Sequence, residues 1–129
     1  MAQNVIVVRA KGARGPQGLA GAGVTPPVTT SLSSNNNNVL DQWQATEYTT
    51  LEYILQIKQG SKIRSSKIMI VTDHTLFYYT EYSIIELGGK INGLSIDAIK
   101  NGSSGQLTIQ ISDANTNNAQ VTFVRTTIA

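Results

Sequence analysis

Apolar and polar residues alternate with a period of two over much of the chain after residue 47, which is typical of β-strands with one buried face. The clearest example is TTLEYILQIK, residues 49–58, in which Ile54 is the one apolar residue on the polar face. The apolar face of this segment carries Leu51, Tyr53, Leu55 and Ile57. KIMIVT, residues 67–72, is apolar on both faces, and this pattern predicts a strand in the centre of a core.

Further strands are predicted over residues 76–85, 94–99, 106–112 and 119–126. KINGLSIDAIK, residues 90–100, could form a short helix, but its glycine and β-branched residues favour a strand. The sequence therefore predicts an all-β fold, an antiparallel β-sandwich of jelly-roll-like or Ig-like form with about six to eight strands.

Polar segments with turn-forming residues separate these strands. Asp73 suits a turn in TDHT, Gly88-Gly89 and Gly93 punctuate LGGKING, and Asn101-Gly102 is typical of a tight hairpin. KQGSKIRSS, residues 58–66, is also predicted to be a turn.

The first 40 residues lack this alternation and predict an extended N-terminal arm, 1–40, before a β-sandwich domain at 41–129. Residues 24–38, VTPPVTTSLSSNNNN, have no period and predict a linker. Glycine occupies every third position within residues 12–23, as a collagen triple helix requires, because only glycine fits at its axis. A flexible Gly/Ala-rich linker is the alternative interpretation of this composition. The triplets predict a homotrimer formed through Gly12, Gly15, Pro16, Gly18 and Gly21.

The arm is also the basic part of the chain. Residues 1–40 carry three bases and no acid, whereas residues 41–129 carry seven bases and eight acids, so the overall charge of +2 divides into +3 and −1. A β-branched run precedes these bases and can add as a strand to a neighbouring sheet. Such a basic arm is attracted to acidic surfaces, of protein or nucleic acid, and ordinary solvated charges on a flexible arm are the alternative. We expect it to anchor the chain on neighbouring protein subunits. The anchoring residues would be Val5, Ile6, Val7, Val8, Arg9, Lys11 and Arg14.

Composition narrows the function classes further. The chain is 40% hydrophobic and 14% charged, and it has no cysteine and one histidine, so disulfides and thiolate or histidine-rich metal sites are excluded. No apolar run is long enough to span a membrane, and the N-terminus lacks the apolar core of a secretion signal. We expect no metal, no cofactor, no membrane partner and no specific nucleic acid.

Three sets of acidic residues lack the features of a catalytic or metal-binding site. Asp73-His74 lacks a nucleophile motif and is expected in a turn. Asp97 and Asp113 lack the spaced oxygen ligands of a calcium loop. Glu81 and Glu86 lie five apart on a predicted strand, so we expect them on opposite faces and not as a glycoside-hydrolysing pair. The sequence predicts that the protein is not an enzyme.

The aromatic cluster of Phe77, Tyr78, Tyr79 and Tyr82 is expected to divide between two faces of one strand. Phe77 and Tyr79 would point one way, and Tyr78 and Tyr82 the other. We expect one pair in the core and the other at a subunit interface or on the outer surface.

Two stretches, EYILQIKQGSKIRSSKIMIVTDHTLFYYTEYSII and the terminal VTFVRTTIA, resemble a small β-domain of tailed-phage virion proteins, above all those of cyanophages and marine phages. The matching segments are Ser66 to Thr72, Thr80 to Ile85 and Val121 to Ile128, and the resemblance covers about residues 43–129. Proteins of this kind are structural components, often with collagen-like stretches near the N-terminus, that decorate capsids or form fibres.

The resemblance implies a virion protein, made in the host cytoplasm and placed on the particle surface. Because the chain is short, with no fibre shaft, we expect a trimeric capsid decoration or cement protein bound to the major capsid protein. The alternative is a short tail or head fibre, or an adaptor, that binds host glycan or connects tail parts.

Overall fold

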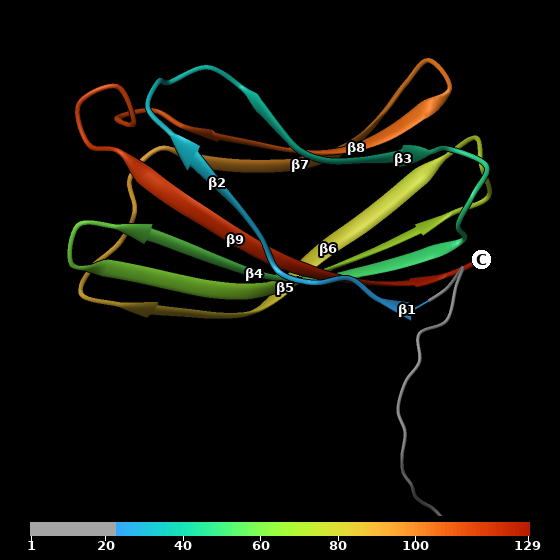
Figure 1. The fold of residues 1–129 in the computed structure, drawn as a ribbon, viewed down its shortest axis with the longest axis horizontal. Helices are drawn as coiled ribbons and strands as arrows, with labels where there is room; N and C mark the ends of the chain where they lie inside the picture. Colours follow the sequence, from blue (N-terminus) through green and yellow to red (C-terminus); the bar gives the residue numbers. More distant parts are fainter. Residues whose placement is uncertain (1–22) are drawn as a thin grey trace, which may run out of the picture.

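The computed structural model describes residues 23–129, which form nine β-strands in two antiparallel sheets (Figure 1). The strands are β1 (Gly23–Val24), β2 (Val28–Leu32), β3 (Asn38–Gln44), β4 (Thr50–Gln59), β5 (Lys62–Thr72), β6 (Phe77–Leu87), β7 (Leu94–Asn101), β8 (Ser104–Ile111) and β9 (Ala119–Ile128). The larger sheet has the order β1-β9-β4-β5-β6, with β2 also paired to β9, and the smaller sheet has the order β3-β8-β7.

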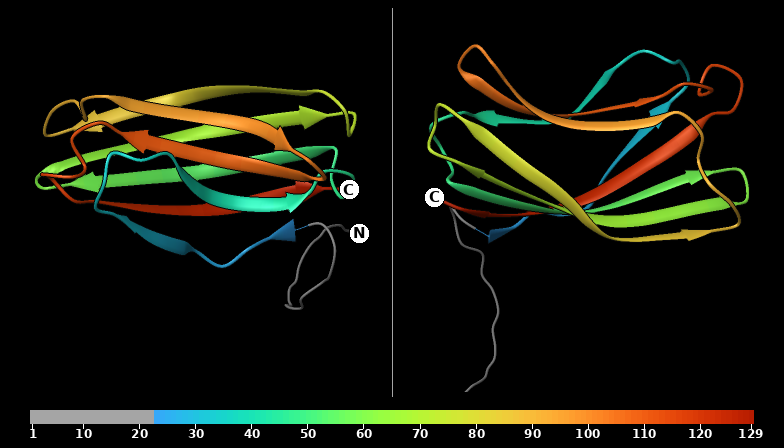
Figure 2. Two further views of the ribbon diagram at one scale, coloured as in Figure 1. Left: turned by 90° about the horizontal axis from the view of Figure 1, so that it is seen from above. Right: turned by 180° about the vertical axis from the view of Figure 1, so that it is seen from behind.

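The two sheets pack face to face as a β-sandwich, as the sequence predicted (Figures 1 and 2). The apolar faces predicted for β4 and β8 line the interior, where Leu51, Tyr53 and Ile109 are fully buried. The core also includes Leu32, Leu40, Trp43, Leu55, Ile57, Ile68, Ile70, Leu107, Ile111, Val121 and Phe123. The all-β prediction is confirmed, with eight strands longer than two residues among residues 23–129.

Glycines shape the turns that the sequence indicated. In the β7–β8 hairpin Asn101 pairs with Ser104, and Gly102 has a φ of 63°. Gly88 and Gly93, at the two ends of the crossover between the sheets, have φ of 82° and 67°, a conformation that glycine adopts at little cost. The helix alternative for residues 90–100 is excluded, because most of them form β7.

The turn predicted over residues 58–66 is much shorter. Gln59 pairs with Lys62, so only Gly60 and Ser61 connect β4 to β5. The prediction failed because the buried face of β5 begins with the polar residues Arg64 and Ser66, which hid the alternation.

The segment predicted as a linker, residues 24–38, also differs from expectation. Val28 to Leu32 pair with β9, where Thr30 lies opposite Val121, and the Leu32 side chain is buried. The valine and threonine residues of β2 favour a strand, and their backbone pairs with β9, about 90 residues away along the chain. Residues 23–40 thus contribute to the sandwich, while the division of the whole chain into arm and domain stays a prediction.

A polar link joins the two sheets through Asp41 of β3. The Tyr53 hydroxyl and the Arg125 Nη1 both donate to Asp41 Oδ2, at 2.7 and 2.8 Å. Burial and the Asp41 carboxylate raise the pKa of Tyr53 far above its ordinary value, so the phenol stays a donor. The guanidinium also lies 5.4 Å from the centre of the Tyr48 ring, in the range of a cation–π contact.

Trp43 packs closely against its neighbouring strand in the smaller sheet. It pairs with Gly105 of β8 and stacks on Phe77 of β6, with ring centroids 6.0 Å apart. A Cβ atom at position 105 would overlap the indole ring, so this position requires glycine.

We predict that Gly105→Ala lowers the free energy of unfolding by about 1–3 kcal/mol, because the added methyl group overpacks the contact with Trp43. In a Trp43→Phe background the same substitution should cost less, by at least about 0.5 kcal/mol, since the smaller ring leaves room. Urea denaturation of the four variants of this double-mutant cycle measures both quantities. Equal costs in the two backgrounds would contradict the packing explanation.

Candidate interaction surface

A β-bulge in β6 decides where its acidic residues lie. Ser65 pairs with Ile85 and Lys67 with Tyr82, so Ser83 and Ile84 together lie opposite one residue of β5. Ser83 has a φ of 54°, which is uncommon for a residue other than glycine. The extra residue reverses the sides on which the following side chains point.

This bulge places Glu81 and Glu86 on the same face of the sheet, opposite Ile68 and Arg64 of β5. The prediction that the two glutamates point to opposite faces is therefore wrong. It assumed an unbroken period of two, and the bulge shifts that period by one residue between them.

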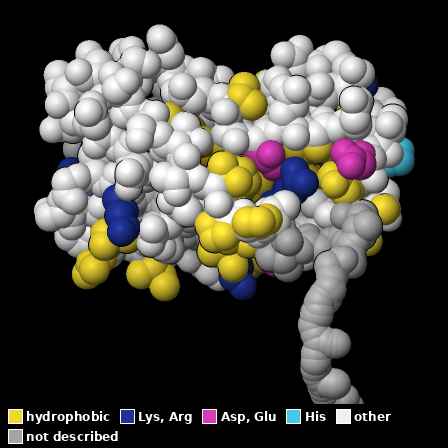
Figure 3. Space-filling view, in the orientation of Figure 1, with side chains coloured by type: hydrophobic (Ala, Val, Ile, Leu, Met, Phe, Trp, Pro, Cys, Tyr) yellow, Lys and Arg dark blue, Asp and Glu magenta, His cyan; other side chains and the backbone are white. Residues whose placement is uncertain are grey.

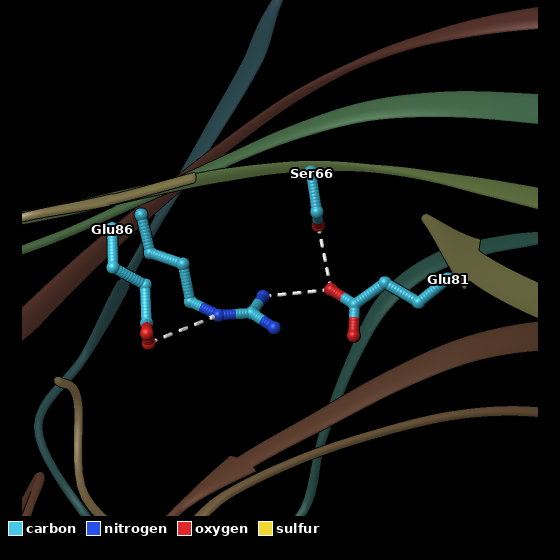
Figure 4. Close-up of polar contacts among 4 residues, drawn as sticks. Ser66, Glu81 and Glu86 are labelled. Atoms are coloured by element: carbon cyan, nitrogen blue, oxygen red, sulfur yellow. Dashed lines mark hydrogen bonds and ion pairs between the residues drawn. The ribbon is translucent and has the colours of Figure 1, made fainter. Parts of the chain in front are cut away.

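Both glutamates contact Arg64, which is 8% exposed (Figure 4). Arg64 Nη1 donates to Glu81 Oε2 at 2.7 Å, and the Ser66 hydroxyl donates to the same oxygen at 2.6 Å. Glu86 Oε2 lies 3.8 Å from Arg64 Nε. The cluster borders a cavity of about 220 Å³ beside the crossover, which Lys90, Ile91, Gly93 and Leu94 also line.

The electrostatics of this cluster favour a structural role. Burial raises the pKa of Glu81, but hydrogen bonds from Arg64 and Ser66 and the charge of Arg64 outweigh it, and the net shift is downward. A general acid requires a raised pKa so that it holds a proton at neutral pH. The guanidinium also contacts both carboxylates, whereas a glycoside-hydrolysing pair needs the substrate between them.

The opposite face of the larger sheet is exposed and apolar. We call this surface the outer face; its exposed apolar members on β4, β5 and β6 include Ile54, Met69, Val71, Tyr78, Ile85 and Leu87. Their exposed fractions run from 37% for Met69 to 69% for Tyr78 and Ile85. Figure 3 shows hydrophobic side chains along the lower edge of the molecule, where Figure 1 places the larger sheet.

Polar groups divide the outer face into two apolar ends. Lys67 lies between Ile54 and Tyr82 in one cross-strand row, and the Tyr82 hydroxyl donates to Glu52. At one end, Met69, Val71, Tyr78, Tyr79 and Thr80 line a largely apolar hollow of about 270 Å³. The outer face is thus a broad surface with a shallow hollow beside Tyr78, a form that suits a macromolecular partner.

The aromatic residues of β6 divide between the two faces as the sequence predicted. The expected core pair is only partly covered, however, because Phe77 is half-buried and Tyr79 is 42% exposed. Phe77 points inward onto Trp43, and Tyr79 donates its hydroxyl to Asp97 of β7 at 2.7 Å. Tyr78 and Tyr82 lie on the outer face.

The remaining acidic candidates have structural partners. Asp73 accepts the backbone N–H groups of Thr75 and Leu76, which lowers its pKa and forms the predicted turn. Asp113 accepts from the Gln59 amide at 2.9 Å. Within residues 23–129 no group of three or more histidine, aspartate or glutamate side chains could hold a metal ion, and no helix is long and apolar enough to cross a membrane.

The residues predicted to anchor the arm and to form the trimer lie outside residues 23–129, and their roles stay predictions. They are Val5, Ile6, Val7, Val8, Arg9, Lys11 and Arg14 for anchoring, and Gly12, Gly15, Pro16, Gly18 and Gly21 for the trimer. Sequence reasoning missed Arg64 as the centre of the polar cluster. The signal was available, because Arg64 and Ser66 continue the alternation that ends at the buried Ile68 and Ile70.

We predict that Glu81→Gln lowers the free energy of unfolding at pH 7 by about 1–3 kcal/mol, because it leaves the buried Arg64 without its closest counter-ion. Glu86→Gln is the matched control and should cost less, since its longer contact lies nearer solvent. The pKa of Glu81 is lowered in the folded state, so its contribution is present above its unfolded value, near 4.5, and is lost as pH falls through the folded value. Denaturation from pH 7 to pH 3 should show a weaker acid dependence for Glu81→Gln than for the wild type. Identical costs and identical acid profiles for the two variants would contradict this assignment.

No protein-family model and no curated protein matches the chain. Solved structures do match, among them two phage tailspike proteins. The tailspike protein of Acinetobacter phage vB_ApiP_P1 aligns with a TM-score of 0.50 and 11% identity, over 96% of this chain and 30% of that one. The tailspike protein of Acinetobacter baumannii phage AM24 aligns with a TM-score of 0.39 and 6% identity, over 81% of this chain and 26% of that one. The chain thus spans less than a third of either tailspike, and its sandwich has a fold similar to a part of the vB_ApiP_P1 tailspike.

Proposed function

We propose that this protein is a non-enzymatic structural module of a phage tail, a short fibre or an adaptor, located on the virion. The observation that carries the proposal is the fold similarity to the vB_ApiP_P1 tailspike over 96% of the chain. The sequence resemblance to small virion β-domains, including those of fibre proteins, supports the same conclusion. The tailspike similarity favours this tail role over the capsid decoration role that the short chain first indicated.

The structure supports a binding role over a catalytic one. Arg64 occupies the position between the two glutamates that a substrate would need, and Glu81 is held in its charged form. The outer face, in contrast, is broad and carries exposed apolar side chains at both of its ends, a feature of surfaces that bind other proteins.

Assembly of several copies would give the module its strength. The glycine triplets favour three chains, and three linked copies can hold a partner firmly through contacts that are weak one at a time.

The test is the location and copy number of the chain in purified particles of the phage that encodes it. We expect quantitative mass spectrometry to find far fewer copies than of the major coat protein, and immunogold labelling to mark the tail. A copy number close to that of the coat protein, with label on the head, would contradict the proposal and restore the decoration role.

A further inference from the structure

We propose that the outer face is buried against neighbouring copies of this chain in a homotrimer. The inference deepens the proposed function and rests on it, because it assumes that the chain works in an assembled, fibre-like module. It assigns the partner of the exposed surface on β4, β5 and β6.

The two sheets provide an internal comparison. The smaller sheet follows the usual rule for an antiparallel sheet, with an apolar inner face and a mostly polar outer one that carries Ser95, Gln106, Thr108 and Gln110. The larger sheet does not, because its outer face carries the six apolar side chains named above. Within residues 23–129 a single chain thus leaves a group of apolar side chains exposed on the larger sheet, whereas Val39 is the one exposed large apolar residue on the strands of the smaller sheet.

Strand β5 shows the mismatch most directly. KIMIVT has the pattern of a strand covered on both sides, and its inward residues Ile68 and Ile70 are fully buried. Its outward residues Met69 and Val71 remain 37% and 51% exposed. A second protein layer over β5 would reconcile the sequence pattern with the burial.

The glycine triplets identify that layer as further copies of the same chain. Read as Gly-X-Y triplets, residues 12–23 favour three chains that meet, and they end at Gly23, the first residue of β1. Strand β1 belongs to the same sheet as the outer face, at the opposite edge from β6 (Figure 2). Three chains joined there would hold their larger sheets at high local concentration.

The edges of the sheet also suit a three-fold arrangement. Each copy has a β6 edge and a β1–β2 edge, and a closed ring requires two such different surfaces on every subunit. Strand β6 is an edge strand and carries the exposed apolar residues Ile85 and Leu87. Native proteins ordinarily cover an edge strand of this kind.

The chemistry of the outer face favours a copy of the chain over other partners. Lys67 and Glu52 give it both signs of charge, which suits a surface of the same composition better than nucleic acid or an anionic membrane. The hollow beside Tyr78 is largely apolar, so it fits an apolar side chain better than the hydroxyl groups of a sugar.

The test is the oligomeric state of the full chain, measured by sedimentation velocity and native mass spectrometry. We expect a trimer for the wild type. Val71→Lys should raise the concentration needed for half-assembly by at least about tenfold, because a charge would be buried among apolar groups. Val39→Lys is the matched control, since Val39 is 49% exposed but lies on β3 of the smaller sheet, and it should leave assembly unchanged. Circular dichroism of both variants checks that they fold, and Ile85→Lys repeats the test at the other end of the outer face.

Two results would overturn the inference. One is a wild type that stays monomeric at high concentration; loss of binding to host polysaccharide in Val71→Lys would then assign the outer face to a glycan. The other is a trimer that Val71→Lys and Ile85→Lys leave intact, which would place the contact elsewhere. Absence of the chain from phage tails would contradict the proposed function, yet it would not change the assembly result, so the two failures are distinguishable.

Discussion

The unequal width of the two sheets is the constraint on which the rest of the structure depends. The larger sheet is five strands wide and the smaller is three, so about 10 Å of the larger sheet has no opposing strand. Strand β6 lies at one edge of the larger sheet, and most of its side chains are exposed. The polar cluster around Arg64 occurs there, because an arginine with two acidic neighbours tolerates a partly covered interior better than an apolar side chain does.

The covered part of the interior is held by two contacts of different kinds. Trp43 lies against Gly105 and Phe77, which joins β3 to its neighbour in the smaller sheet and to β6 in the larger one. Asp41 accepts from Tyr53 and Arg125, which joins β3 to β4 and β9. Each contact packs or pairs a large side chain in the core, while the buried Trp43 Nε1 and Arg125 Nε have no hydrogen-bond partner among residues 23–129. Both involve β3, so this strand couples the two sheets.

The bulge at Ser83 connects the interior to the outer face. By shifting the period of β6 by one residue, it turns Glu86 inward to Arg64 and Ile85 and Leu87 outward. The same local feature therefore brings two acidic residues that are five apart in the sequence onto the buried Arg64 and adds two apolar side chains to the outer face. If β6 were a regular strand, Glu86 would point outward, and Ile85 and Leu87 would point inward.

The sequence by itself determined the strands whose alternation is continuous, such as β4 and β8, and the hairpin at Asn101-Gly102, because their pattern and turn chemistry are local. It also determined the two-sided apolar character of β5 and the division of the aromatic residues before the bulge. Only the tertiary structure decided that residues 28–32 form a strand, because their partner on β9 lies about 90 residues away and supplies the hydrogen bonds. It likewise decided that Glu81 and Glu86 converge on Arg64, since a bulge depends on how two strands align and the hydrophobic pattern of β6 alone did not reveal the shift.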